Sequence, residues 1–187
     1  MVNLPKIVGV MGLPCAGKTI FTDMVIANLS NYGLKLNIYR CKMSDWIYKK
    51  LKCLDLEVTK ENMIWLSNVL INKFGRKYLS NIVYRDIVSI QKEYDIIFIE
   101  TGYAFEELKL LKEKLNNMIL VCIVADESCL KQRVFKRENE PEKTLMVIKS
   151  LKHKINFYIN HCDYVVNNSG DLKELNEDVK QFIKKIL

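Results

Sequence analysis

Residues 12–19 match every fixed position of the pattern G-x-x-x-x-G-K-[ST]. This match constrains the fold, because such a loop works between a buried strand and the first turn of a helix. Residues 7–11 form a short apolar run that suits the strand, and apolar residues follow at helical spacing over residues 20–29. A helix N-terminus behind a glycine loop favours bound phosphate. The motif therefore predicts a nucleoside triphosphate site.

The fixed positions of this loop each have a physical reason. Gly12 and Gly17 let the backbone curl so that amide groups point at phosphate oxygens. Lys18 brings an ammonium to the β- and γ-phosphates, and the Thr19 hydroxyl can ligate Mg²⁺. The expected cofactors are ATP and Mg²⁺; the chain has no N/T-K-x-D motif for reading guanine, which favours adenine. The nucleotide-binding loop is expected to comprise Gly12, Leu13, Pro14, Cys15, Ala16, Gly17, Lys18 and Thr19.

The rest of the chain alternates between strand-like apolar runs and helix-like apolar stripes. Strands are expected at 7–11, 36–40, 94–100, 118–125 and 164–167. Helices are expected near 20–29, 44–51, 59–74, 79–90, 105–115, 128–134, 145–159 and 172–186. This order predicts one α/β domain over residues 1–187, with a five-stranded, mostly parallel sheet and helices on both faces. The helices between the second and third strands exceed one crossover, so residues of about 44–92 are predicted to form an inserted substrate arm.

Two carboxylates are expected at the ligand-binding edge of the sheet. Glu100 ends the very apolar third strand, where it would hold Mg²⁺ through water or orient the phosphoryl acceptor. The alternative for Glu100 is a strand-end side chain that reaches solvent. Asp45 follows the second strand and can accept a proton from an attacking hydroxyl, but an Asp there can equally cap a helix.

Basic residues near the expected nucleotide are further candidates. Arg133 and Arg137 lie four apart on one helix face, where they could neutralise a transferred phosphoryl group or simply form a solvated basic face. Asn168 follows the last strand, either close to the nucleotide base or in an ordinary turn. Weaker candidates for binding an acceptor phosphate are Arg40, Arg76 and Arg85.

Composition narrows the class of protein only modestly. The formal net charge of +7 is compatible with phosphorylated substrates or nucleic acid, but the lysines are scattered among glutamates. No apolar run approaches the roughly 18 residues of a membrane span. The six cysteines form no C-x-x-C pair, and neither they nor the two histidines show a zinc pattern. Without an export signal, a cytoplasmic protein with reduced cysteines is expected.

Taken in order, these motifs resemble the P-loop nucleoside monophosphate kinase group, most closely the dephospho-CoA kinases and their archaeal relatives. The likeness runs from the loop through Met43-Ser44-Asp45 and Ile-Ile-Phe-Ile-Glu100 to the arginine helix at 130–137. It ends with Cys-Asp-Tyr-Val-Val-Asn-Asn-Ser-Gly at 162–170, which is similar to the family's Ala-Asp-Tyr-Val-Ile-x-Asn-x-Gly.

This resemblance implies a three-layer P-loop NTPase fold with a mobile lid, at about residues 133–145. It also implies transfer of the γ-phosphoryl group of ATP to a nucleotide-like hydroxyl or phosphate. The chain departs from the family after the third strand, where Asp-Gly followed by Arg is common and Glu100-Thr101-Gly102-Tyr103 stands instead. The arginine that would clamp the acceptor phosphate is missing, and Tyr103 could stack on a ring.

Three functions stay open at this point. The chain is expected to be a small-molecule kinase, acting as a monomer or homodimer without a membrane partner. A kinase for RNA or another polynucleotide is the first alternative, since the opening Gly-Leu-Pro-Cys also resembles kinases related to transfer RNA. A regulatory P-loop ATPase that phosphorylates no other molecule is the second.

Overall fold

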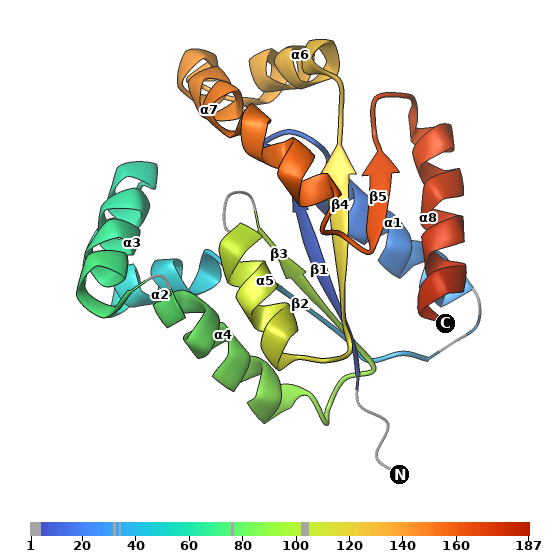
Figure 1. The fold of residues 1–187 in the computed structure, drawn as a ribbon, viewed down its shortest axis with the longest axis horizontal. Coiled ribbons are helices and arrows are strands. Elements are labelled where there is room, and N and C mark those ends of the chain that lie inside the picture. Colours follow the sequence, from blue (N-terminus) through green and yellow to red (C-terminus); the bar gives the residue numbers. More distant parts are fainter. Residues whose placement is uncertain (1–4, 32, 34, 76, 102–104) are drawn as a thin grey trace.

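The fold was examined in a computed structural model, which describes residues 5–31, 33, 35–75, 77–101 and 105–187 (Figure 1). Its sheet has five strands in the order β2-β3-β1-β4-β5, and every neighbouring pair is parallel. This sheet confirms the predicted α/β class. The strands are β1 (Lys6–Gly12), β2 (Ile38–Lys42), β3 (Ile96–Glu100), β4 (Met118–Val124) and β5 (Tyr164–Asn167).

The helices follow the expected order, but α7 starts at a different residue from the one expected. They are α1 (Lys18–Asn31), α2 (Asp45–Cys53), α3 (Lys60–Phe74), α4 (Lys77–Ile90), α5 (Phe105–Lys114), α6 (Glu127–Arg137), α7 (Pro141–Ile159) and α8 (Leu172–Ile186). Helix α7 begins four residues earlier than expected, because Pro141 occupies a first-turn position where a missing N–H costs nothing. The predicted lid segment therefore has only residues 138–140 between its two helices.

Strand β2 lies two residues further along the chain than its apolar pattern indicated. It is an edge strand whose side chains are mostly half-buried, so its apolar signal is weak. Its register is set instead by pairing with β3, which places Ile38 beside Ile96 and Lys42 beside Glu100.

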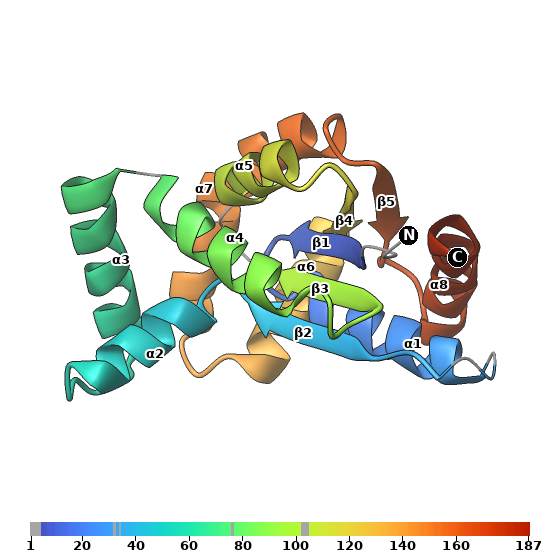
Figure 2. The same cartoon turned by 90° about the horizontal axis from the view of Figure 1, so that it is seen from below.

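Two apolar layers cover the sheet (Figures 1 and 2). Helices α1 and α8 pack on one face, where the rings of Phe21 and Phe182 lie 5.3 Å apart. Helices α4 and α5 pack on the other face through Val83, Ile87 and Leu108, which are fully buried. This three-layer arrangement brings the carboxyl ends of all five strands to one edge.

The helices between β2 and β3 divide into two parts. Helices α2 and α3 pack on each other in a small separate cluster around Ile47, Leu51 and Leu66. They project from the sheet as an arm, seen on the left of Figure 1. Helix α4 instead belongs to the layer that covers the sheet, because Val83 and Ile87 lie in its core.

Within the described residues, no helix is both long and apolar enough to cross a membrane. All six cysteines are free, and Cys15, Cys41 and Cys122 are buried among apolar side chains.

Candidate functional site: the loop after strand β1

The glycine-rich loop joins β1 to α1 at the carboxyl edge of the sheet and packs closely against strand β4 and Asn168. A Cβ added to Gly12 would lie 2.3 Å from the main-chain oxygen of Ile123 in the neighbouring strand β4. A Cβ added to Gly17, where φ is +101°, would lie 2.0 Å from Nδ2 of Asn168. Both positions of the motif are therefore fixed to glycine by close approach, and not only by the turn itself.

Lys18 begins α1 and folds back over this loop. Its ammonium donates hydrogen bonds to the carbonyl oxygens of Gly12, at 3.0 Å, and Leu13, at 2.9 Å. Burial lowers the pKa of Lys18 to about 8, and the nearby charge of Glu100 opposes this shift only in part. A poorly solvated ammonium inside a glycine loop is well suited to bind an anion that replaces its lost water.

Glu100 lies next to the first turn of α1 and is only 3 % exposed. Its Oε2 accepts a hydrogen bond from the Thr19 hydroxyl at 3.3 Å, and its Oε1 accepts one from Nε of Arg40 at 2.7 Å. The guanidinium of Arg40 also pairs with Asp23, one turn beyond Thr19 on α1. Burial lowers the pKa of Arg40, but hydrogen bonds and charges from Asp23 and Glu100 leave it above its ordinary value. The buried carboxylate is thus oriented by one hydroxyl and one permanent cation.

The residues predicted to hold Mg²⁺ are brought together. The Thr19 hydroxyl and the Glu100 carboxylate are hard oxygen donors in direct contact, which is the donor chemistry that Mg²⁺ prefers. Among the residues that the structure describes, no group of three or more His, Cys, Asp or Glu side chains could hold a metal by itself. Two protein oxygens fit a cation that keeps several waters and takes its other ligands from phosphates.

Asn168 is buried against the loop. Its side-chain Nδ2 donates to the main-chain oxygen of Ala16 at 2.8 Å, and its main-chain oxygen accepts from Nη2 of Arg133 at 2.8 Å. Nη1 of Arg133 is also buried and has no hydrogen-bond partner in the described part of the chain. A buried guanidinium with an unused donor beside a phosphate loop is positioned to bind an anion.

The charges on α6 converge on Cys15 in the middle of the loop. Burial raises the pKa of the Cys15 thiol, and the positive charges of Arg137, Lys18 and Arg133 act against this rise. Arg133 and Arg137 therefore lie within electrostatic reach of the loop, although Arg137 is exposed and lies 3.7 Å from the Glu138 carboxylate.

Asp45 lies at the same edge of the sheet, because Met43, two residues before it, is joined to β3. The Met43 amide donates a hydrogen bond to the Glu100 carbonyl oxygen. Oδ2 of Asp45 accepts from the main-chain N–H of Lys42 at 2.7 Å, which is a structural, turn-stabilising role. Two candidates, Arg76 and Tyr103, lie outside the described residues, and Arg85 is exposed on α4.

Two site residues were missed or misjudged by the sequence reasoning. Arg40 was considered only as a weak acceptor-phosphate candidate, yet it pairs with Glu100 across 60 positions of sequence. Asp23 was not considered at all, although it pairs with the same guanidinium. Asp23 lies four residues after Thr19 on α1, and this helical spacing is a signal that could have found it.

A parallel five-stranded sheet, with this loop after its central strand and an acidic residue ending the neighbouring strand β3, matches the expected three-layer P-loop fold. Solved structures confirm the expected likeness in fold. The chain is similar to TT1252 from Thermus thermophilus, with 15 % identity and a TM-score of 0.64 over 99 % of this chain and 100 % of that one. It is also similar to shikimate kinase from Acinetobacter baumannii in complex with shikimate, with 15 % identity and a TM-score of 0.58 over 99 % and 94 % of the two chains.

A third similar structure is dephospho-CoA kinase from Campylobacter jejuni, with 13 % identity and a TM-score of 0.58 over 98 % of both chains. No protein-family model matches the chain, and no curated protein matches it either. At these identities the similarity establishes the fold.

Proposed function

We propose that this chain is a Mg²⁺- and ATP-dependent phosphotransferase that moves the γ-phosphoryl group to a nucleotide-like small molecule, of the dephospho-CoA or nucleoside monophosphate type. The observation that carries this proposal is the contact between Thr19 and the buried Glu100 carboxylate, beside the Lys18 ammonium in a complete phosphate-binding loop. Kinases of small molecules among the similar folds support it.

The residues divide the chemistry of phosphoryl transfer among themselves. Main-chain amides of the loop and Lys18 would bind the polyphosphate, and Arg133 and Arg137 would stabilise the charge that spreads over the transferred group. An acceptor oxygen attacks the γ-phosphorus while the bond to the bridging oxygen of ADP breaks. The acceptor's proton leaves to a carboxylate, for which Glu100 and Asp45 are the candidates.

The Mg²⁺ ion would be held by Thr19 and, directly or through water, by Glu100. When bound, it supplies neutralising charge on the β- and γ-phosphate oxygens. The helical insertion between β2 and β3, which comprises α2, α3 and α4, would contact the acceptor, and the α6–α7 turn would act as the lid. Six free cysteines suit a reducing, cytoplasmic setting.

The test is an ADP-release assay of the purified chain with Mg²⁺ and ATP against a panel of acceptors. The panel contains all nucleoside monophosphates, dephospho-CoA, shikimate and a short RNA with a free 5′-hydroxyl. Acceptor-dependent ADP with one small molecule is the expected result, and Lys18→Ala should abolish it, by on the order of 10³-fold or more, with an unchanged circular dichroism spectrum. Transfer to RNA alone, or slow hydrolysis that no acceptor stimulates, would overturn the small-molecule assignment.

Glu100→Gln separates the proposed role of this carboxylate from simple nucleotide binding. We expect turnover to fall by about 10²-fold or more, with a much smaller change in ATP affinity, because the carboxylate acts on the acceptor and the metal. Equal losses in turnover and in ATP affinity would count against that role.

A further inference from the structure

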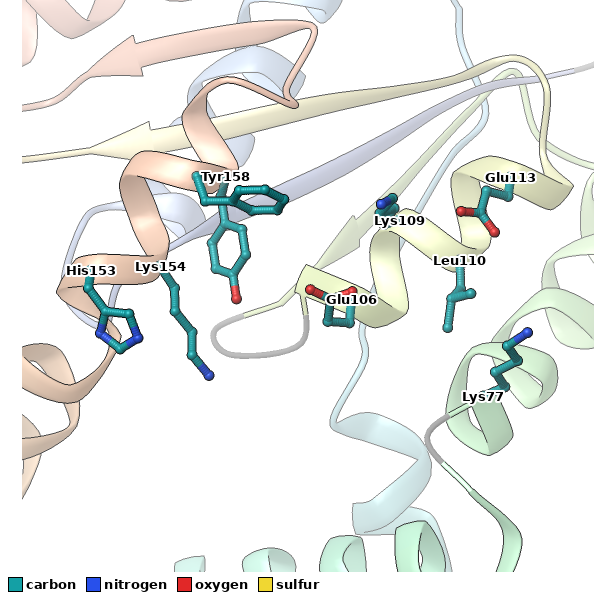
Figure 3. Close-up of a pocket in the computed structure, with 9 residues that line it drawn as sticks. Lys77, Glu106, Lys109, Leu110, Glu113, His153, Lys154 and Tyr158 are labelled. Atoms are coloured by element: carbon teal, nitrogen blue, oxygen red, sulfur yellow. The ribbon is translucent and has the colours of Figure 1, made fainter.

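A hollow of about 600 Å³ lies between helices α4, α5 and α7, on the sheet face opposite α1 and α8 (Figure 3). Its volume is within the range of small-molecule sites, which is about 300–1,000 Å³. None of its lining residues belongs to the loop, the arginine pair or the carboxylates described above. The hollow therefore needs its own explanation.

Three lysines from three helices surround this hollow: Lys77 on α4, Lys109 on α5 and Lys154 on α7. Over the described residues, none of these three ammonium groups takes part in a hydrogen bond or ion pair. Lysines two or three residues away on two of these helices are paired, since Lys112 on α5 binds Asp163 and Lys152 on α7 binds Glu127 at 2.7 Å.

This contrast is informative because the hollow does contain two carboxylates, Glu106 and Glu113. Neither forms an ion pair with a lining lysine in the described structure, so the lining carries a formal excess of one positive charge, with its three lysines spread around the space (Figure 3). Ammonium groups that line a concave surface from separate elements are suited to hold an anionic molecule.

Aromatic side chains line the α7 side of the hollow. The Tyr158 ring stacks on the Phe105 ring with centroids 3.9 Å apart, and the Phe157 ring meets the Phe105 ring edge-on, with centroids 6.4 Å apart. Phe157 is 50 % exposed although its neighbours hold it in place, so a flat apolar ligand could cover it at little cost in side-chain entropy.

A polar pair lies beside these aromatic side chains. Burial raises the pKa of the Tyr158 phenol, and the carboxylates of Glu106 and Glu107 raise it further. Figure 3 shows the hydroxyl of Tyr158 and the carboxylate of Glu106 pointing toward the same space. A hydrogen-bond donor and an acceptor beside an aromatic surface can bind the polar edge of a ligand's ring.

We propose that this hollow binds the phosphoryl acceptor, which is an anionic molecule carrying a flat ring, with its ring on Phe157 and its negative charge on Lys77, Lys109 and Lys154. This assignment of the acceptor rests on the proposed function. The distance along the chain allows it, because Phe105 at the start of α5 is five residue steps after Glu100, a span of at most ~18 Å. The three lysines would take over the acceptor clamp that an arginine after β3 would otherwise supply.

The first experiment measures binding in the hollow without ATP. The probe is 8-anilinonaphthalene-1-sulfonate, which combines flat rings with one anionic group, and its fluorescence is titrated with the full chain. The double variant Lys109→Ala/Lys154→Ala should weaken binding about ten-fold or more. The matched control is Lys173→Ala on α8, on the opposite face of the sheet, which should leave the affinity unchanged. All three proteins should show the same circular dichroism spectrum, since the substituted lysines are exposed.

Two further comparisons make this binding test specific. The uncharged analogue N-phenyl-1-naphthylamine should bind equally to wild type and to the double lysine variant. Adenosine 5′-monophosphate should displace the sulfonate probe at a concentration about ten-fold lower than adenosine does. Probe affinity that ignores the lysines, or equal displacement with and without the phosphate, would overturn the proposal.

The second experiment separates this proposal from the proposed function. Lys18→Ala should bind the sulfonate probe as tightly as wild type, because the hollow is distinct from the loop. With an identified acceptor, Lys109→Ala/Lys154→Ala should raise the KM for the acceptor about ten-fold and change the KM for ATP less than two-fold. An unchanged acceptor KM would overturn the proposal while phosphotransfer stands. Lysine-dependent probe binding in a chain that phosphorylates no acceptor would instead overturn the proposed function.

Discussion

At the scale of single residues, Lys18 links nucleotide binding to pH. Its pKa of about 8 lies below the ordinary 10.5, so the folded protein holds this proton more weakly than the unfolded chain does. The corresponding loss of stability is present below pH 8 and is relieved as the pH rises toward 10.5. A bound polyphosphate reverses this effect, because its negative charge favours the charged ammonium.

We therefore expect ATP binding at pH 8 to take up about half a proton, and ATP affinity to fall as the pH rises above 8. Calorimetric titrations in two buffers with different ionisation enthalpies measure this uptake directly. Lys18→Arg is the control, since a guanidinium keeps its proton throughout this range and should show no uptake. Equal heats in both buffers for the wild type would contradict the prediction.

Gly17 is a position at which the loop tolerates little change. A Cβ there meets Nδ2 of Asn168, which is itself held by the carbonyl oxygen of Ala16, and φ is +101°. Gly17→Ala should cost about 2–4 kcal/mol of unfolding free energy and abolish ATP binding, because it combines backbone strain with a displaced buried amide. Gly75→Ala has a similar φ of +81° but nothing within 4 Å, so it should cost only about 1 kcal/mol. Similar losses in urea unfolding of the two variants would refute the role of Asn168.

At the scale of elements, Arg40 connects three pieces of secondary structure, since it lies on β2 and pairs with Asp23 on α1 and Glu100 on β3. Arg40→Gln leaves the Glu100 carboxylate buried without a permanent cation, which should cost about 2–4 kcal/mol. Asp23→Asn removes the partner that is 57 % exposed and should cost less than about 1 kcal/mol. Urea unfolding of both variants measures the difference; a larger loss for Asp23→Asn would place the important contact on the surface.

The same elements show which features the sequence could predict. Apolar runs such as residues 96–100 and the stripe of α8 reveal their structure because burial imposes a periodicity on neighbouring residues. Edge strand β2 is half-buried and was predicted two residues too early, and α7 was predicted to start at residue 145 because its apolar stripe begins there, four residues after Pro141. The helix boundaries around the predicted lid were therefore the least accurate.

The loop of the candidate site could be predicted because its residues are contiguous, whereas its partners could not. The pairing of Arg40 with Glu100 depends on strand order, and the bond from Asn168 to Ala16 joins residues 152 positions apart. No local pattern carries either contact. The hollow between α4, α5 and α7 is invisible in sequence for the same reason, since it exists only once three separate helices meet.

At the scale of the whole molecule, the sheet separates a supporting face from a binding face. The layer of α1 and α8 contains the aromatic contacts of Phe182 with Phe21 and Tyr164, both at 5.3 Å. The proposed acceptor hollow lies on the other face. The glycine loop is fixed mainly by β4 and Asn168, so damage to the α8 layer should reach stability before it reaches the site.

Phe182→Ala tests this separation. The ring is fully buried, so its removal should lower the free energy of unfolding by about 3–5 kcal/mol. Below the melting transition, the affinity for ATP should change less than about three-fold, because the aromatic partners of this ring are Phe21 and Tyr164, neither of which belongs to the loop. Leu172→Ala on the same helix removes a side chain that is 64 % exposed and should cost less than about 0.5 kcal/mol. If Phe182→Ala weakens ATP binding as strongly as it weakens folding, α8 holds the loop through α1, and the two faces are one cooperative unit.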